Sequence, residues 1–201
     1  MRTRNQSKSF IMSLENKNFS LKHRLLHWLI AFTILFLMLT VFLRLTWLEK
    51  NNVAAILQDN LKALNISLNQ DDAIKIAKQI RKPMWDWHIY SGYFLIGLYI
   101  LRLLNLYFSG IVFPNPFHRA SKLRQKIQGW TYIIFYFLMG ISLITGFFIV
   151  NGSPEYKDFL ETIHVQSIYY VVLFIIMHMT GLLISEFSNE KGIVSKMIYG
   201  K

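Results

Sequence analysis

Four long segments without a charged side chain most constrain what this chain can fold into. They span 25–43, 87–101, 127–154 and 162–185, and the second segment resumes after Arg102 and runs to residue 108. A helix needs about 20 apolar residues to cross ~30 Å of hydrocarbon, and inside lipid the backbone must satisfy its own hydrogen bonds. We therefore predict an all-α fold, an integral membrane four-helix transmembrane bundle, with helices near 22–47, 86–108, 127–150 and 162–186.

The composition favours a single membrane domain over 1–201. Hydrophobic residues make up 53% of the chain and charged residues 16%, which is too apolar for an ordinary soluble domain. The chain has no cysteine, so disulfides, iron–sulfur ligation and thioether-attached haem are excluded. The N-terminus has no apolar core before residue 20, so we expect no cleavable signal peptide. The stretches PNP (114–116) and NGSP (151–154) predict breaks between helices.

Lysine and arginine are concentrated on alternate loops. Residues 2–24 hold six basic residues against one acid, and 109–126 hold four against none. The segments 49–86 and 151–161 together hold seven basic and eight acidic residues. This is the positive-inside pattern, so both termini and the 109–126 loop are expected in the cytoplasm. The net charge of +11 is thereby accounted for, and we predict no nucleic-acid partner.

The extracytoplasmic loop 48–85 is longer than a simple connection needs. Helical periodicity at 53–64 and 71–82 predicts two short amphipathic helices, the second beginning with acids and ending with bases as the helix dipole favours. The alternative is a solvated linker with some helix. Trp85 and Trp87 mark the interface where the chain returns to the membrane.

Four histidines fall at matching depths of the predicted bundle. His164 and His178 are fourteen residues apart in one predicted helix, which places them on nearly the same face and about 21 Å apart along its axis. With the topology above, His164 lies near the outer surface and His178 deeper. His27 lies one turn into the first helix, which starts in the cytoplasm, and is therefore at the depth of His178. His88 lies at the start of the second helix, which enters from outside, and is therefore level with His164. Each pair joins the fourth helix to a different helix.

Two imidazoles facing each other inside lipid suit a six-coordinate haem iron, whose porphyrin supplies the other four nitrogens. Zinc would need three or four protein ligands, and no Cys, Asp or Glu stands beside these histidines. A proton relay is an alternative, although relays normally recruit carboxylates. Another is a buried imidazole bonded to a neighbour. His23, one turn before His27, could compete as a ligand, but we expect it among the lipid headgroups.

Two further features fit a porphyrin. Gly92 follows His88 by four residues and Gly181 follows His178 by three, so each glycine lies on its histidine's face, where a flat ring would need small residues; close helix packing is the alternative. Arg102 lies fourteen residues after His88, about 21 Å deeper. A haem propionate would be a natural counter-ion for this guanidinium, and snorkelling to the headgroups is the alternative.

The stretches RLLHW (24–28), HIYSGYFLIGLYILR (88–102) and TG (145–146), with the pair His164 and His178, resemble the bacterial cytochrome b561 family. That family includes the cytochrome b subunits of nickel–iron hydrogenases and a bacterial superoxide oxidase. The resemblance covers roughly 22–186 and implies a multi-pass protein of the bacterial inner membrane with two non-covalent haem b groups. It implies that His27 and His178 ligate the inner haem, and that His88 and His164 ligate the outer one.

The resemblance also implies electron transfer between the quinone pool and a periplasmic or membrane redox partner. The long 48–85 loop departs from the shortest members, and either docking of a periplasmic redox protein or shielding of the outer haem would explain it. One alternative function is superoxide oxidation at the outer haem, with the anion attracted by a basic group of residues before the second helix, namely Lys75, Lys78, Arg81 and Lys82. The other alternative is a haem-free membrane anchor or scaffold subunit.

Overall fold

The computed structural model describes residues 19–109, 116–117, 123–187 and 192–200, and this part of the chain is helical and contains no strand. The order of elements is α2 (Leu21–Leu45), α3 (Lys50–Ala63), α4 (Gln70–Ile80), α5 (Lys82–Ser109), α6 (Leu123–Asn151), the 3-10 turn η1 (Pro154–Tyr156), α7 (Lys157–His164), α8 (Ser167–Glu186) and α9 (Ile193–Ile198). Most of the PNP stretch lies outside the described residues.

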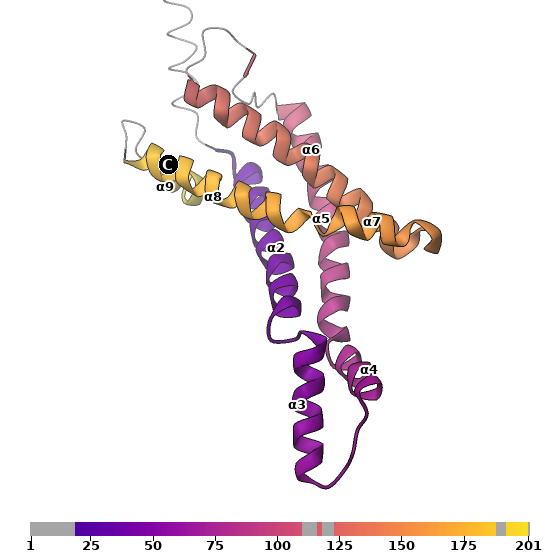
Figure 1. Ribbon diagram of the computed structural model, residues 1–201. Coiled ribbons are helices and arrows are strands. Elements are labelled where there is room, and N and C mark those ends of the chain that lie inside the picture. The colour runs from indigo at the N-terminus through magenta and orange to yellow at the C-terminus, as the bar shows by residue number, and fades with distance from the viewer. Residues whose placement is uncertain (1–18, 110–115, 118–122, 188–191, 201) are drawn as a thin grey trace, which may run out of the picture.

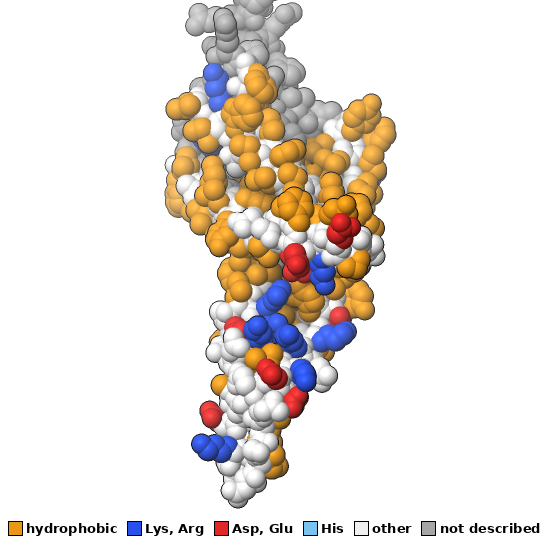
Figure 2. Space-filling model, turned by 45° about the vertical axis from the view of Figure 1, so that its right-hand side comes forward, with side chains coloured by type: hydrophobic (Ala, Val, Ile, Leu, Met, Phe, Trp, Pro, Cys, Tyr) orange, Lys and Arg blue, Asp and Glu red, His pale blue; other side chains and the backbone are white. Residues whose placement is uncertain are grey.

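Four segments are long and apolar enough to cross a membrane, which confirms the prediction of four spanning helices. They are Leu21–Leu45, Lys82–Phe108, Leu123–Asn151 and Pro154–Glu186. Figure 2 shows apolar side chains covering most of the surface over these helices, with charged side chains gathered beyond one end. An exposed apolar surface of this extent needs lipid around it.

The four spans meet at one apolar cluster. Leu95 of α5, Met139 of α6 and Val171 of α8 are buried together. Side chains of α2 pack against them, including Ile30 and Ile34. Figure 1 shows α2 and α5 running alongside each other while α8 runs across the direction of α2.

The second and third spans begin earlier than the sequence predicts. We expected helices from 86 and 127, whereas α5 begins at Lys82 and α6 at Leu123. The expectation took charged residues as the limit, but a helix can continue past the hydrocarbon into water. Pro83 does not prevent this, because the first turn of a helix has no intrahelical hydrogen bond for a proline to remove.

The fourth span is not the single helix that was expected over 162–186. It is divided into α7 and α8 by a turn at Val165 and Gln166. There the Gln166 amide donates to the Ile163 carbonyl at 3.2 Å, and the Tyr169 amide donates to the Gln166 carbonyl at 3.1 Å. These three-residue bonds are tighter than those of an α-helix. The ideal angular relation between His164 and His178 therefore does not hold.

A cap begins the first span, and the predicted break after the third span is present. Ser20 accepts a hydrogen bond from the His23 amide and caps α2. The NGSP stretch forms the break after α6, where Gly152 donates to the Phe148 carbonyl. A Cβ at Gly152 would lie 2.5 Å from that carbonyl oxygen, so the turn requires glycine.

The 48–85 loop contains the two helices that were predicted, α3 and α4. They pack as a hairpin that lies beyond the adjoining ends of α2 and α5 (Figure 1). Its centre is made of three alanines with no exposed surface, Ala54, Ala73 and Ala77. Their small side chains allow the two helix axes to approach closely. Asn69 caps α4 by accepting from the Asp72 amide at 2.9 Å.

Candidate functional site

The structure brings His27 of α2 and His178 of α8 together. Their ring centroids lie 6.1 Å apart, with the ring planes inclined by 43°. Both rings are half-buried and flanked by aromatic side chains. Phe174 stacks on His178 at 5.7 Å, and Trp28 meets His27 edge-on at 5.6 Å.

This spacing fits two ligands of one metal ion. An ion bound by imidazoles on opposite sides, each at about 2.0–2.1 Å, separates the ring centroids by roughly 6 Å. In the described part of the chain, no group of three or more His, Cys, Asp or Glu side chains is placed to hold a metal. A site with only two protein donors is too poor for structural zinc and suits a haem iron, whose remaining ligands come from the porphyrin.

The His88 ring of α5 is held from both its edge and its face. Its Nδ1 lies 2.7 Å from the Thr40 hydroxyl of α2. That hydroxyl donates its own proton to the Leu37 carbonyl at 2.6 Å, so it accepts from Nδ1–H of the imidazole. Trp85 stacks on the ring with centroids 4.6 Å apart and planes inclined by 4°. With the proton on Nδ1, Nε2 keeps a lone pair for a metal.

His164, at the end of α7, has the same arrangement with a different partner. Its Nδ1 lies 3.0 Å from the Ser142 carbonyl of α6, and a carbonyl can only accept, so Nδ1 carries the proton. The Thr145 hydroxyl lies 3.3 Å from the same nitrogen. Nε2 of His164 is again the atom with a lone pair. An imidazole oriented through Nδ1–H is the usual arrangement of a metal-binding histidine.

Gly146 makes room for the His164 ring. A Cβ at this position would lie 2.8 Å from His164 Cε1 and 3.3 Å from Nδ1. The His88 and His164 rings make no stacking contact with each other among the described residues, so the outer pair stays a prediction.

Gly92 lies beside open space. A Cβ added there would meet no atom within 4 Å, and the same holds at Gly181. Close helix packing, the alternative explanation of these glycines, predicts near neighbours that neither position has.

Arg102 of α5 is buried, with 8% of its surface exposed. Its Nη1 donates to His23 Nδ1 at 3.1 Å, and its Nε donates to the Tyr136 hydroxyl at 3.0 Å. His23, which was expected among the headgroups, is thus packed inside against a cation, with 5% exposed. His23 and Tyr136 accept these bonds as neutral groups, and no acidic side chain among the described residues forms an ion pair with the guanidinium.

Sequence reasoning missed the groups that orient the outer histidines. Thr40 lies in an apolar run 48 residues from His88, and the Ser142 contribution is a backbone carbonyl. The dipeptide at 145–146 was noted as part of a resemblance, and the structure places both of its residues against His164. The stacking of Trp85 on His88 was also not foreseen, although the three-residue spacing of the two side chains on one helix permits it.

Comparison with known proteins gives one family. The family model described as prokaryotic cytochrome b561 matches residues 18–200, which is nearly the whole chain. No curated protein and no solved structure matches the chain.

Proposed function

Because this chain belongs to the prokaryotic cytochrome b561 family, we propose that it is a di-haem electron carrier between the quinone pool and a redox partner. The family and the four spans establish a multi-pass bacterial membrane protein, a b-type cytochrome of electron transfer that binds haem. The proposal adds the number of haems, their ligands, the quinone, and the location in the inner membrane with both termini in the cytoplasm.

The observation that carries the proposal is the meeting of histidines from different helices. His27 and His178 face each other at the separation that one metal ion requires, and we assign them to the inner haem. His88 and His164, both with Nδ1 engaged and Nε2 unprotonated, are assigned to the outer haem. Each haem supplies an iron that takes up and gives up one electron at a time.

The chain's own residues orient the ligands and set the local charge. Thr40 and the Ser142 carbonyl fix the tautomer and direction of the outer imidazoles, which raises their basicity as ligands. Arg102, held by His23 and Tyr136, keeps a positive charge against His23, one turn before His27, where it favours a carboxylate of a bound cofactor. Gly92 leaves space on the His88 face.

Haem content and electron transfer test this proposal together. Protein purified in detergent, after expression with adequate haem supply, should contain two non-covalent b haems per chain, and the reduced form should be reoxidised by a quinone analogue. Reoxidation by quinone with only one haem per chain would contradict the di-haem assignment. Absence of haem would leave only the anchor or scaffold alternative.

Superoxide oxidation stays a second candidate because cations lie close to the outer histidine. Arg44 lies over the face of Trp85, which stacks on His88. If superoxide is the electron donor, its reaction rate should fall steeply as salt screens these charges. A rate independent of salt and of charge reversal at Arg81 excludes this candidate.

A further inference from the structure

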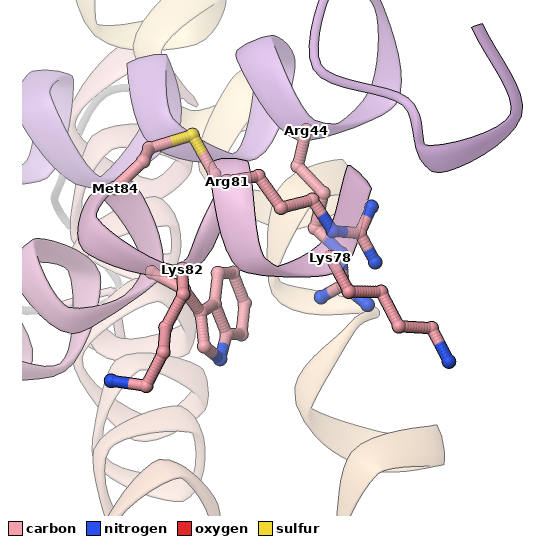
Figure 3. A pocket seen from close by; sticks show the side chains of 6 residues that line it. Arg44, Lys78, Arg81, Lys82 and Met84 are labelled. Carbon is pink, nitrogen blue, oxygen red and sulfur yellow. The ribbon is translucent and has the colours of Figure 1, made fainter. Parts of the chain in front are cut away.

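A basic pocket lies where the α3–α4 hairpin joins the membrane spans. Its cavity of about 200 Å³ is lined by Arg44, Lys78, Arg81, Lys82, Met84 and Trp85 (Figure 3). A second hollow of about 390 Å³ shares Arg44, Lys78 and Arg81 with it. Three cations from α2, α4 and the junction before α5 therefore face two adjoining hollows, and each hollow exceeds the space that one water molecule needs.

Acids near this basic pocket balance only part of its positive charge among the described residues. In the described ranges, no carboxylate forms an ion pair with Arg44, Lys78 or Arg81. Lys82 is neutralised by Asp86 at 2.7 Å. Glu49, which lines the second hollow, accepts from the Asn51 and Asn52 amides as the cap of α3. Cations gathered without counter-ions repel each other, so a bound anion would stabilise them.

The donors suit a phosphate-type anion. Two guanidinium groups and an ammonium group can surround a tetrahedral oxyanion, and arginine binds phosphate oxygens through paired N–H donors. Figure 3 shows Arg44 and Arg81 extending into the same space. A carboxylate offers only two oxygens and would leave part of this donor set without a partner.

The position of the pocket adds a membrane source for the phosphate. Arg44 is the basic residue in the last turn of the apolar helix α2, and Figure 2 shows basic side chains next to the apolar surface. Leu45 lines one hollow and Met84 the other, so apolar contacts adjoin the cations. A lipid phosphate could lie here with its acyl chains along the spans, and free inorganic phosphate could reach the same cations from water.

We propose that Arg44, Lys78 and Arg81 form a binding site for a phosphate group, carried by an anionic phospholipid or free in solution. The site is connected to the outer histidine. Arg44 Cζ lies 4.5 Å from the centre of the Trp85 ring, whose other stacking partner is His88. A phosphate held by Arg44 adds negative charge near His88, and this effect on the outer haem, unlike the binding itself, rests on the proposed function.

Calorimetric titration of the detergent-purified, haem-loaded protein tests binding. The probes are inorganic phosphate, a short-chain phosphatidylglycerol and the phosphatidylcholine of equal chain length. Saturable binding of phosphatidylglycerol alone supports a lipid source, and binding of inorganic phosphate supports a soluble one. No saturable binding of either anionic probe, or equal binding of the phosphatidylcholine, overturns the proposal.

A matched pair of double variants assigns the site. Lys78→Gln with Arg81→Gln removes two pocket cations, and Lys62→Gln with Lys75→Gln removes two cations of the same hairpin that line neither hollow. We expect affinity to fall about tenfold or more in the first variant and to stay near the wild-type value in the second. Equal affinities in both variants refute the site, and a circular dichroism spectrum confirms that each variant is helical.

Redox titration tests the effect of phosphate on the haem potential separately from phosphate binding itself. Phosphate binding should lower the midpoint potential of the haem assigned to His88, because added negative charge disfavours reduction. Binding without a shift refutes the connection through Trp85 and leaves the site standing. Absence of haem from the purified protein would refute the proposed function. The calorimetric result would still decide whether the pocket binds phosphate.

Discussion

Replacing Gly146 by alanine should selectively weaken the outer haem site. The new Cβ would lie 2.8 Å from His164 Cε1, whereas carbon atoms in contact prefer about 3.5–4.0 Å, so the ring must retreat by at least ~0.7 Å. The ring is not free to do so, because Nδ1 is bonded to the Ser142 carbonyl at 3.0 Å. Overpacking of this kind costs about 1–3 kcal/mol.

If this energy destabilises the position of the His164 ring that binds haem, haem affinity at the outer site drops about 5- to 150-fold. The assay is haem content per chain with reduced-minus-oxidised spectra, measured through a haem-limited titration. Gly97→Ala is the matched control, since a Cβ at Gly97 meets nothing within 4 Å. Unchanged content and spectra in Gly146→Ala would refute the idea that this glycine makes room for a ligand.

Three further substitutions test neighbouring contacts. Thr40→Val removes the hydroxyl that accepts from the outer histidine of α5 and should weaken haem retention about 10- to 100-fold, as loss of an orienting partner does at metal sites. Tyr136→Phe removes the hydrogen bond from Arg102. It should lower the free energy of unfolding, measured by thermal unfolding, by about 1.5–3 kcal/mol, as loss of a hydrogen bond to a charged group does. Asp72→Asn should remove an acid-sensitive part of hairpin stability, because hydrogen bonds from Lys75 and Asn69 lower the pKa of Asp72. Since the folded pKa is the lower one, this contribution is complete above the unfolded value of 3.8 and disappears as pH falls through the folded value.

Each of these has a control. Thr33→Val removes a hydroxyl that bonds only to its own helix, at the Leu29 carbonyl, and should leave haem retention unchanged. Tyr107→Phe changes a side chain that is 82% exposed and should leave thermal unfolding unchanged. For Asp72→Asn, helicity measured against pH should match the wild type in strong acid and differ above pH 3.8. An identical pH profile in both proteins contradicts the role given to Asp72.

The four spans were predictable because lipid sets a length and a composition that the chain must meet. Their starts were less predictable, since charged residues such as Lys82 mark the edge of the hydrocarbon and do not end a helix. The turn at Val165 was missed for a related reason. Periodicity continues through it, and the change to tighter hydrogen bonds leaves no mark in residue type.

The histidine pairs were predicted from depth, and the ring centroids of His27 and His178 lie 6.1 Å apart, while the pairing as ligands stays a prediction. The groups that orient the outer pair were not predictable. Threonines in an apolar helix usually bond to their own backbone, as Thr33 does, so nothing in the sequence distinguishes Thr40. The partner of His164 is a carbonyl, which every residue possesses.

The partner of Arg102 was also not foreseen. The sequence pointed to a cofactor carboxylate or the headgroups, and the structure places His23 and the Tyr136 hydroxyl on the guanidinium. Those contacts join α5 to α2 and α6, and sequence spacing carries no information about which helices will be neighbours. Because no acid in the described ranges pairs with this charge, a cofactor carboxylate stays compatible with the site.

The central claim is that the four histidines form two pairs, and single substitutions by alanine test it most directly. Reduced-minus-oxidised spectra and haem content should show loss of one haem in His27→Ala and in His178→Ala. They should show loss of the other haem in His88→Ala and in His164→Ala. Loss of the same haem from His27→Ala and His88→Ala, or a full haem complement in any of the four variants, would contradict the account.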